Sequence, residues 1–294
     1  MYTGHSIVLN GSVYFGGGMA ADNDKYLVYC YESSQVQWFT LPPLPVRYFR
    51  LGQVEGRLVA VGGLSKATRE FCSVVYTFDE RSRKWKQTLP PMPTARHSPV
   101  VVSFESALVV AGGTKEGEVY ANVVEIYVSG SSQWFRTDPV PAPCQSMSAA
   151  ASANTFFTVG GYEHPSFLSQ AWCASVDDLI RNAVPANQAI NSSSSPHSAW
   201  KVLPNTPTYT PAAAALAGSF LAIGGYNTPK GDIAQKEIFM YSPSTESWIH
   251  IGDLPEPRSN AMTVMLSSTE ILVIGGWHNG PKSTVYKGTL TMKI

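Results

Sequence analysis

Six glycine pairs, each closing a short apolar run such as LVAVGG or LVVAGG, constrain the fold of this chain more than any other feature. Counted from the second glycine, the intervals between pairs are 46, 50, 48, 64 and 51 residues. Self-similarity at a period near 50 residues indicates a repeat architecture. The pairs are Gly16-Gly17, Gly62-Gly63, Gly112-Gly113, Gly160-Gly161, Gly224-Gly225 and Gly275-Gly276.

The length, composition and charge of the chain agree with one folded domain. The repeat runs through all 294 residues without a linker, so a single domain spanning 1–294 is predicted. A content of 44% apolar and 14% charged residues supports a buried core and excludes disorder. Because the formal net charge is zero and no Lys/Arg-rich block occurs, neither nucleic acid nor a membrane is an expected partner.

Each repeat unit contains four strand-like segments. A Trp follows the second glycine by 21 to 23 residues in four units, and a Tyr or Phe precedes that Trp by seven. Proline-bearing links such as LPPLPVR and LPEPR follow, where no ladder N–H is needed. Four antiparallel strands in about 50 residues make one β-propeller blade. The blades are expected at approximately 1–44, 45–93, 94–143, 144–207, 208–257 and 258–294.

The pattern resembles the kelch repeat. The diglycine, the aromatic residue seven positions before the Trp, and an Arg opening several units carry this resemblance (Arg47, Arg96 and Arg258). The resemblance covers essentially the whole chain and implies an all-β, six-bladed kelch-type β-propeller with four-stranded antiparallel blades. Two departures stand out: Trp200 follows its glycines by 39 residues, and units 4 and 5 lack the opening Arg.

Two segments interrupt the regular pattern. Residues 181–199 form a polar insertion in unit 4, which we expect to be a flexible surface loop, and a recognition role for it stays open. Unit 6 has room for a third strand but no Trp-bearing fourth strand, so a three-stranded last blade is predicted. Either the chain is a fragment of a longer protein, or blade 6 has an open edge that invites self-association.

No catalytic motif is present, and the expected class is not an enzyme. The six histidines are scattered, so neither a cofactor nor a metal is expected. Cys30, Cys72 and Cys173 lie in expected strands as buried reduced thiols, whereas Cys144 follows a proline-rich link and is expected to be accessible. The cysteine spacing and the lack of a secretory signal pattern favour a cytoplasmic protein.

The resemblance implies a binding surface at one mouth of the channel, ringed by the loops between strands 2 and 3 and between successive blades. Arg, Tyr and Trp are frequent in interface hot spots, and the arginines favour an acidic segment. The expected function is a protein–protein interaction module that binds a protein or peptide partner, with a metal-binding or oxidase-like propeller as the alternative. For the three arginines, bracing of neighbouring strands is the competing role. The candidate residues are Arg47, Arg96, His97, Tyr162, His164, Tyr209, Tyr226, Asn227, Arg258, Asn260, Trp277 and His278.

Overall fold

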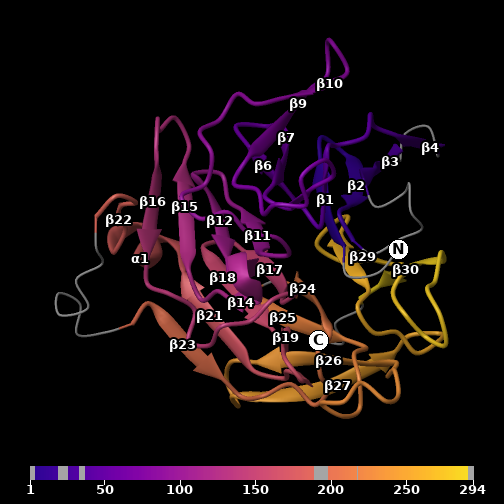
Figure 1. Cartoon of the computed structure of the whole chain (residues 1–294). Helices are drawn as coiled ribbons and strands as arrows, with labels where there is room; N and C mark the ends of the chain where they lie inside the picture. The colour runs from indigo at the N-terminus through magenta and orange to yellow at the C-terminus, as the bar shows by residue number, and fades with distance from the viewer. Residues whose placement is uncertain (1–3, 19–25, 33–36, 189–197, 217, 291–294) are drawn as a thin grey trace.

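The computed structural model describes residues 4–18, 26–32, 37–188, 198–216 and 218–290, and it is a six-bladed β-propeller (Figure 1). All strand pairs within the blades are antiparallel, and successive strands run from the centre to the rim. This arrangement confirms the predicted fold class. The helical content of the described residues is limited to α1 (Val176–Arg181) and short 3-10 turns such as Glu116–Glu118.

Blades 1 to 3 come from the first half of the chain. Blade 1 contains β1 (His5–Leu9), β2 (Ser12–Gly16), β3 (Val28–Glu32) and β4 (Gln37–Thr40). Blade 2 contains β6 (Arg50–Val54), β7 (Arg57–Val61), β9 (Val75–Asp79) and β10 (Lys84–Lys86). Blade 3 contains β11 (Val100–Ser103), β12 (Ala107–Ala111), β15 (Val124–Val128) and β16 (Trp134–Thr137).

Blades 4 to 6 follow in the same order. Blade 4 contains β17 (Ser148–Ser152), β18 (Thr155–Val159), β21 (Ala171–Ser175) and β23 (Trp200–Leu203). Blade 5 contains β24 (Ala212–Leu216), β25 (Ser219–Ile223), β26 (Glu237–Ser242) and β27 (Ser247–Asp253). Blade 6 contains β28 (Met262–Met265), β29 (Glu270–Ile274) and β30 (Val285–Thr289).

The inner strands form a closed ring. Each of β1, β6, β11, β17, β24 and β28 contacts the inner strands of both neighbouring blades, and the contact between β28 and β1 closes the circle. In Figure 1 the indigo blade 1 accordingly lies beside the yellow blade 6. The small side chains of β17 (SAAAS) and β24 (AAAAL) fit this position, because blades converge toward the axis and leave least room there.

The glycine pairs lie where successive blades touch, at the end of the second strand. A Cβ on Gly224 would lie 2.1 Å from the carbonyl oxygen of Arg258, which opens the next blade. The neighbouring Gly225 donates its N–H to that same oxygen at 2.7 Å. Both glycines have positive φ, at 61° and 104°. Close approach and left-handed backbone together explain why the pair recurs.

Four tryptophans on outer strands tie their blade to the preceding one. The indole Nε1 of Trp85 donates to the carbonyl of Pro42 at 2.8 Å, in the link that follows the fourth strand of blade 1. The same bond recurs around the propeller: Trp134 to Pro90 at 2.8 Å, Trp200 to Asp138 at 3.1 Å and Trp248 to Pro204 at 2.9 Å. The proline-bearing links are therefore acceptors as well as connections between blades.

The insertion in unit 4 is only partly as predicted. Its first residues continue α1, and β22 (Val184–Pro185) pairs with β16 as a fifth strand on blade 3. The carboxylate of Asp138 accepts from Asn182 Nδ2 at 2.9 Å and from the Ala199 N–H at 3.0 Å. The prediction of a flexible loop was therefore wrong for residues 181–188, because the segment can pair with the edge of β16. Residues 189–197 lie outside the described part.

Blade 6 has three strands within the described residues, as predicted, and residues 1–3 and 291–294 lie outside them. The expectations for the cysteines were only partly right: Cys30 is buried, but Cys72 and Cys173 are half-buried. Cys72 lies in a loop between β7 and β9, where its N–H donates to the Gly63 carbonyl. Cys144 is fully buried, and burial raises the pKa of its thiol to about 12. No helix in the described part of the chain is long and apolar enough to cross a membrane.

Candidate functional site: the mouth of the channel

Two of the three opening arginines are buried in the framework. Arg96 is 0% exposed, pairs with the equally buried carboxylate of Glu125, and donates from Nη2 to the Val110 carbonyl at 3.1 Å. Arg258 is 1% exposed and donates to the Gly275 carbonyl at 2.7 Å and the Tyr286 hydroxyl at 3.0 Å. The sequence left two roles open for these arginines, namely partner binding and bracing of neighbouring strands. These contacts show that both side chains brace neighbouring strands.

A repeated backbone geometry builds the rim of the mouth. In blades 2 to 6, a residue just before the inner strand pairs antiparallel with the residue that follows the glycine pair. Tyr209 and Tyr226, for example, exchange two backbone hydrogen bonds, at 2.9 and 2.8 Å. This pairing brings the two sets of loops together at one end of the channel. The five pairs are Arg47–Leu64, His97–Thr114, Gln145–Tyr162, Tyr209–Tyr226 and Ser259–Trp277.

The next residue in each of these five blades has a left-handed backbone. None of the five is a glycine, although the left-handed region is unfavourable for other residues. Such strain is concentrated at binding and catalytic sites in proteins, because the surrounding structure must hold it in place. The five residues, with their φ angles, are Tyr48 (57°), Ser98 (51°), Ser146 (55°), Thr210 (48°) and Asn260 (51°).

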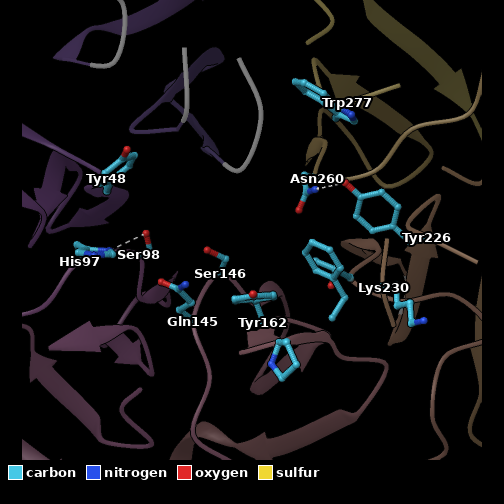
Figure 2. Close-up of a pocket in the computed structure, with 13 residues that line it drawn as sticks. Tyr48, His97, Ser98, Gln145, Ser146, Tyr162, Tyr226, Lys230, Asn260 and Trp277 are labelled. Carbon is cyan, nitrogen blue, oxygen red and sulfur yellow. Dashed lines mark hydrogen bonds between the residues drawn. The ribbon is translucent and has the colours of Figure 1, made fainter. Parts of the chain in front are cut away.

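All five left-handed residues line one cavity at the mouth, with a volume of about 500 Å³ (Figure 2). This volume lies within the range of small-ligand and peptide side-chain pockets. Besides these five, the lining residues are His97, Gln145, Tyr162, Pro165, Phe167, Tyr226, Lys230 and Trp277.

Blades 4 to 6 supply an aromatic arc to this cavity. Phe167, in the short strand β20 (Ser166–Phe167), lies 4.8 Å from the Tyr226 ring and 5.2 Å from the Tyr162 ring, between centroids. Its N–H donates to the Pro229 carbonyl at 2.8 Å, which joins the loops of blades 4 and 5. The Asn260 Nδ2 donates to the Tyr226 hydroxyl at 3.1 Å, as Figure 2 shows, so this ring is held from blade 6 as well.

Blades 2 and 3 supply a histidine that lies between aromatic rings. The His97 ring stacks on Phe71 at 5.2 Å and lies 5.5 Å from the Tyr48 ring. Burial, followed by the charges of Arg50 and Arg47, lowers the pKa of His97 to about 4, so the imidazole is neutral at pH 7. Among the described lining residues, Lys230 carries the one formal charge and none is acidic. The described lining of the mouth therefore offers aromatic rings, one lysine and no carboxylate.

The structure brings five of the twelve sequence-predicted residues into the cavity: His97, Tyr162, Tyr226, Asn260 and Trp277. Arg47, His164, Tyr209, Asn227 and His278 lie in the same loops without lining it. Arg47 instead lies over the ring of Tyr48 at 5.0 Å.

Sequence reasoning left eight lining residues out of the candidate set. Ser98, Gln145, Ser146 and Thr210 carry no chemical signature of their own. Their position two or three residues before the inner strand of each blade is the signal that could have found them, since Tyr48 and Asn260 share it. Pro165 and Phe167 belong to a loop whose course into the cavity is not visible in the sequence, whereas Lys230 lies in a loop that the resemblance already places at the mouth.

No group of three or more His, Cys, Asp or Glu side chains within the described ranges is placed to hold a metal ion. His164 and His278, the histidines nearest to the glycine pairs, do not line the cavity. Nothing in the geometry of the mouth thus favours the metal-binding alternative over a binding surface.

Comparison with known proteins identifies the family to which the chain belongs. Residues 48–276 match the KLHDC2/KLHL20/DRC7 Kelch-repeats domain, which covers well over half of the chain. The chain belongs to the kelch-repeat family. The solved structure of YjhT has the same fold, with a TM-score of 0.77, 99% of this chain and 95% of that chain covered, and 13% sequence identity.

The curated kelch relatives are longer than this chain. The Kelch-like protein terF of Aspergillus terreus is 25% identical over 168 residues, covering 53% of this chain and 37% of that protein. The Kelch-like protein 38 of Rattus norvegicus is 24% identical over 259 residues, covering 85% and 39% respectively. The kelch propeller described above thus spans well under half of the length of these relatives.

Proposed function

We propose that this kelch propeller is a non-enzymatic interaction module that binds a peptide segment of a protein partner in the mouth cavity. The observation that carries the proposal is the set of five left-handed, non-glycine residues that line one cavity from five successive blades. Tyr162, Tyr226 and Trp277 add the side-chain types that dominate protein-interface hot spots. These rings form a rigid apolar arc that can take up side chains of an extended peptide.

We further propose that the bound segment is acidic. Lys230 lines the cavity, and the charges of Arg50 and Arg47 act on His97 at the opposite side. Arg50 is 3% exposed, and among the described residues its guanidinium contacts only the Phe49 and Gly17 carbonyls, at 3.3 and 3.5 Å. A buried guanidinium without a carboxylate is costly, and a partner carboxylate nearby would offset this cost.

Selection from a displayed library of random twelve-residue peptides tests both statements. Peptides that bind the wild-type protein should be enriched in Asp and Glu, and their affinity should fall as salt is raised. Selected peptides without acidic enrichment would contradict the acidic preference. The proposed site would be wrong if the selected peptides compete with one another for the wild type but bind the Tyr162→Ala/Trp277→Ala variant with unchanged affinity.

A matched pair of charge reversals isolates the role of the cavity. Lys230→Glu places a negative charge in the lining and should weaken a selected acidic peptide about tenfold or more. Lys84→Glu makes the same change on β10, at the outer edge of blade 2, and should leave the affinity within about twofold. Equal effects of both substitutions would mean that net charge, not the mouth, governs binding.

The edge of β30 is a second surface that we propose for binding, including self-association. Edge strands present unpaired backbone groups, and among the described residues β30 lies at the end of its sheet. Sedimentation of the protein over a range of concentrations measures whether copies associate. A monomer at every concentration would contradict self-association.

We also propose a cytoplasmic location, supported by four cysteines that form no disulfide. Fractionation of cells that express the tagged full-length protein, with thiol labelling before and after reduction, tests it. Recovery in a secreted or lumenal fraction would contradict it.

A further inference from the structure

Two polar side chains meet at the corner of the mouth cavity where blades 5 and 6 adjoin. Asn260 Nδ2 lies 3.1 Å from the Tyr226 hydroxyl, and this is the one side-chain hydrogen bond that either residue makes within the described ranges. Both residues line the cavity. In Figure 2 the amide oxygen of Asn260 points away from Tyr226, toward the open centre of the view. The pair therefore keeps hydrogen-bonding groups that a ligand in the cavity can reach.

The pair offers one donor and one acceptor, whichever residue supplies the shared proton. When the Asn260 amide donates to the phenol oxygen, the amide oxygen is left as an acceptor and the phenol O–H is left as a donor. When the phenol donates to a flipped amide, the NH2 group is left as the donor and a phenol lone pair as the acceptor. Either arrangement presents a donor beside an acceptor.

Backbone pairing holds both residues in place. Tyr226 exchanges two backbone hydrogen bonds with Tyr209, at 2.8 and 2.9 Å. Asn260 follows Ser259, which exchanges two backbone hydrogen bonds with Trp277, at 2.8 and 3.1 Å. Tyr226 is 8% exposed, so little of its side chain reaches the cavity. A ligand therefore meets a preorganised pair, and little conformational entropy is lost when it binds.

The left-handed backbone at residue 260 does not by itself require an asparagine. Asparagine adopts this conformation more readily than most residues. The same position in blades 2 to 5 is nevertheless occupied by Tyr48, Ser98, Ser146 and Thr210. A side chain that bonds to Tyr226 is thus not imposed by the repeat.

Neighbouring hydroxyl groups in the lining distinguish ligands less well. The Thr210 hydroxyl donates its proton to the Gly161 carbonyl at 2.9 Å, and the residue is 2% exposed. The Ser98 hydroxyl lies 3.1 Å from His97 Nδ1. A single hydroxyl can pair with a donor or with an acceptor, so it selects neither. The corner of Asn260 and Tyr226 is different because it needs both at once.

A primary carboxamide matches such a pair. It carries a C=O acceptor and an N–H donor on one planar edge. A carboxylate has acceptors only and an ammonium has donors only, so each leaves one member of the pair without a partner, which weakens binding. In a trans peptide bond the C=O and N–H point in opposite directions, so a backbone amide does not present both to one corner. The matching group is therefore a side chain.

We propose that the corner formed by Asn260 and Tyr226 binds the side-chain carboxamide of an Asn or Gln in the bound peptide. The carboxamide accepts a hydrogen bond from one member of the pair and donates one to the other. This assignment rests on the proposed function, since it names one residue class of the segment that binds in the mouth. It places one amide residue at a fixed position in a segment that is otherwise acidic.

Peptides selected against the wild-type protein from the random twelve-residue library are the probe. When these peptides are aligned, we expect Asn or Gln at one common position. Changing that residue to Asp or Glu, its isosteric acid, should weaken binding about tenfold or more in calorimetry at constant ionic strength. A general preference for negative charge predicts the opposite sign, so this loss isolates the amide.

Asn260→Gly tests the pair in the protein. Glycine adopts the left-handed backbone without strain, so the variant keeps the backbone of the mouth and loses only the amide. The remaining Tyr226 hydroxyl donates at least as well to a carboxylate as to a carboxamide, and the preference for the amide peptide over its acid should disappear. Ser98→Gly is the matched control, because it removes a side chain from the same left-handed position of blade 3 in the same cavity. It should keep the preference of about tenfold.

Two results would overturn this assignment while leaving the proposed function in place. One is a set of mouth-binding peptides without a common Asn or Gln, and the other is an amide preference that Asn260→Gly leaves unchanged. Selected peptides that bind the Tyr162→Ala/Trp277→Ala variant as they bind the wild type would overturn the mouth as the site, and this assignment with it. The two failures are thus distinguishable.

Discussion

The mouth and the outer rim of the propeller use the repeat in opposite ways. At the mouth the backbone repeats, with the same pairing and the same left-handed residue in blades 2 to 6, but the side chains there are Tyr, Ser, Ser, Thr and Asn. Around the rim the side chain repeats, since a Trp bonds to the preceding link in four blades. The repeated contacts stabilise the fold. The side chains that vary on a repeated backbone are available to bind a partner.

The largest expected effect comes from breaking a repeated framework contact. Glu125→Ala leaves the Arg96 guanidinium buried without its carboxylate and should lower the free energy of unfolding by about 3–5 kcal/mol. Glu246→Ala removes an exposed ion pair with Lys201, which solvent screens, and should change the free energy of unfolding far less. Urea denaturation of both variants measures the difference. Equal costs would mean that Arg96 does not brace the blade.

The glycine pairs give the next comparison. Gly224→Ala adds a methyl group 2.1 Å from a backbone oxygen at φ 61° and should cost about 3 kcal/mol, from both overpacking and left-handed strain. Gly11→Ala, in the type I′ turn between β1 and β2, meets no atom within 4 Å and should cost about 1 kcal/mol. Thermal unfolding of the two variants checks the order, and the reverse order would contradict the structural role of the pairs.

The mouth should also be sensitive to acid. Because the folded pKa of His97 is about 4 and the ordinary value is 6.5, the unfolded chain binds the proton first as pH falls. This residue therefore costs no stability above pH 6.5 and destabilises the fold progressively between pH 6.5 and 4, by about 2 kcal/mol at pH 5. Urea denaturation at pH 7 and 5 should show a smaller difference for His97→Gln than for the wild type. An unchanged difference would mean that His97 titrates normally.

Much of the fold was predictable from the sequence because the propeller is a sum of similar units. Gly224, Trp248 and the proline links recur at fixed spacing, and each recurrence constrains the same contact. The fifth strand β22 was missed because it pairs with β16, about 50 residues earlier in the chain, and only two residues take part. Such a short, distant pairing leaves no periodic signal.

The candidate site was less predictable, for a related reason. Arg96 and Arg258 stood out by residue type, yet they are buried, while Ser98 and Thr210 line the cavity without any chemical signature. Backbone conformation selects the lining residues, and a left-handed Thr is not what local propensity favours. Phe167 reaches the cavity through a loop held by Pro229 of the next blade, a contact that the sequence does not display.

The most direct test of the central claim compares two exposed tryptophans. Trp277, at the mouth, is 36% exposed, and Trp38, at the rim, is 44% exposed, so replacement by Ala removes a similar surface from each. The measurement is the affinity of one acidic peptide, selected against the wild type, for both variants. We predict a loss of at least tenfold for Trp277→Ala and no more than a twofold change for Trp38→Ala. An unchanged affinity for Trp277→Ala together with a loss for Trp38→Ala would contradict binding at the mouth.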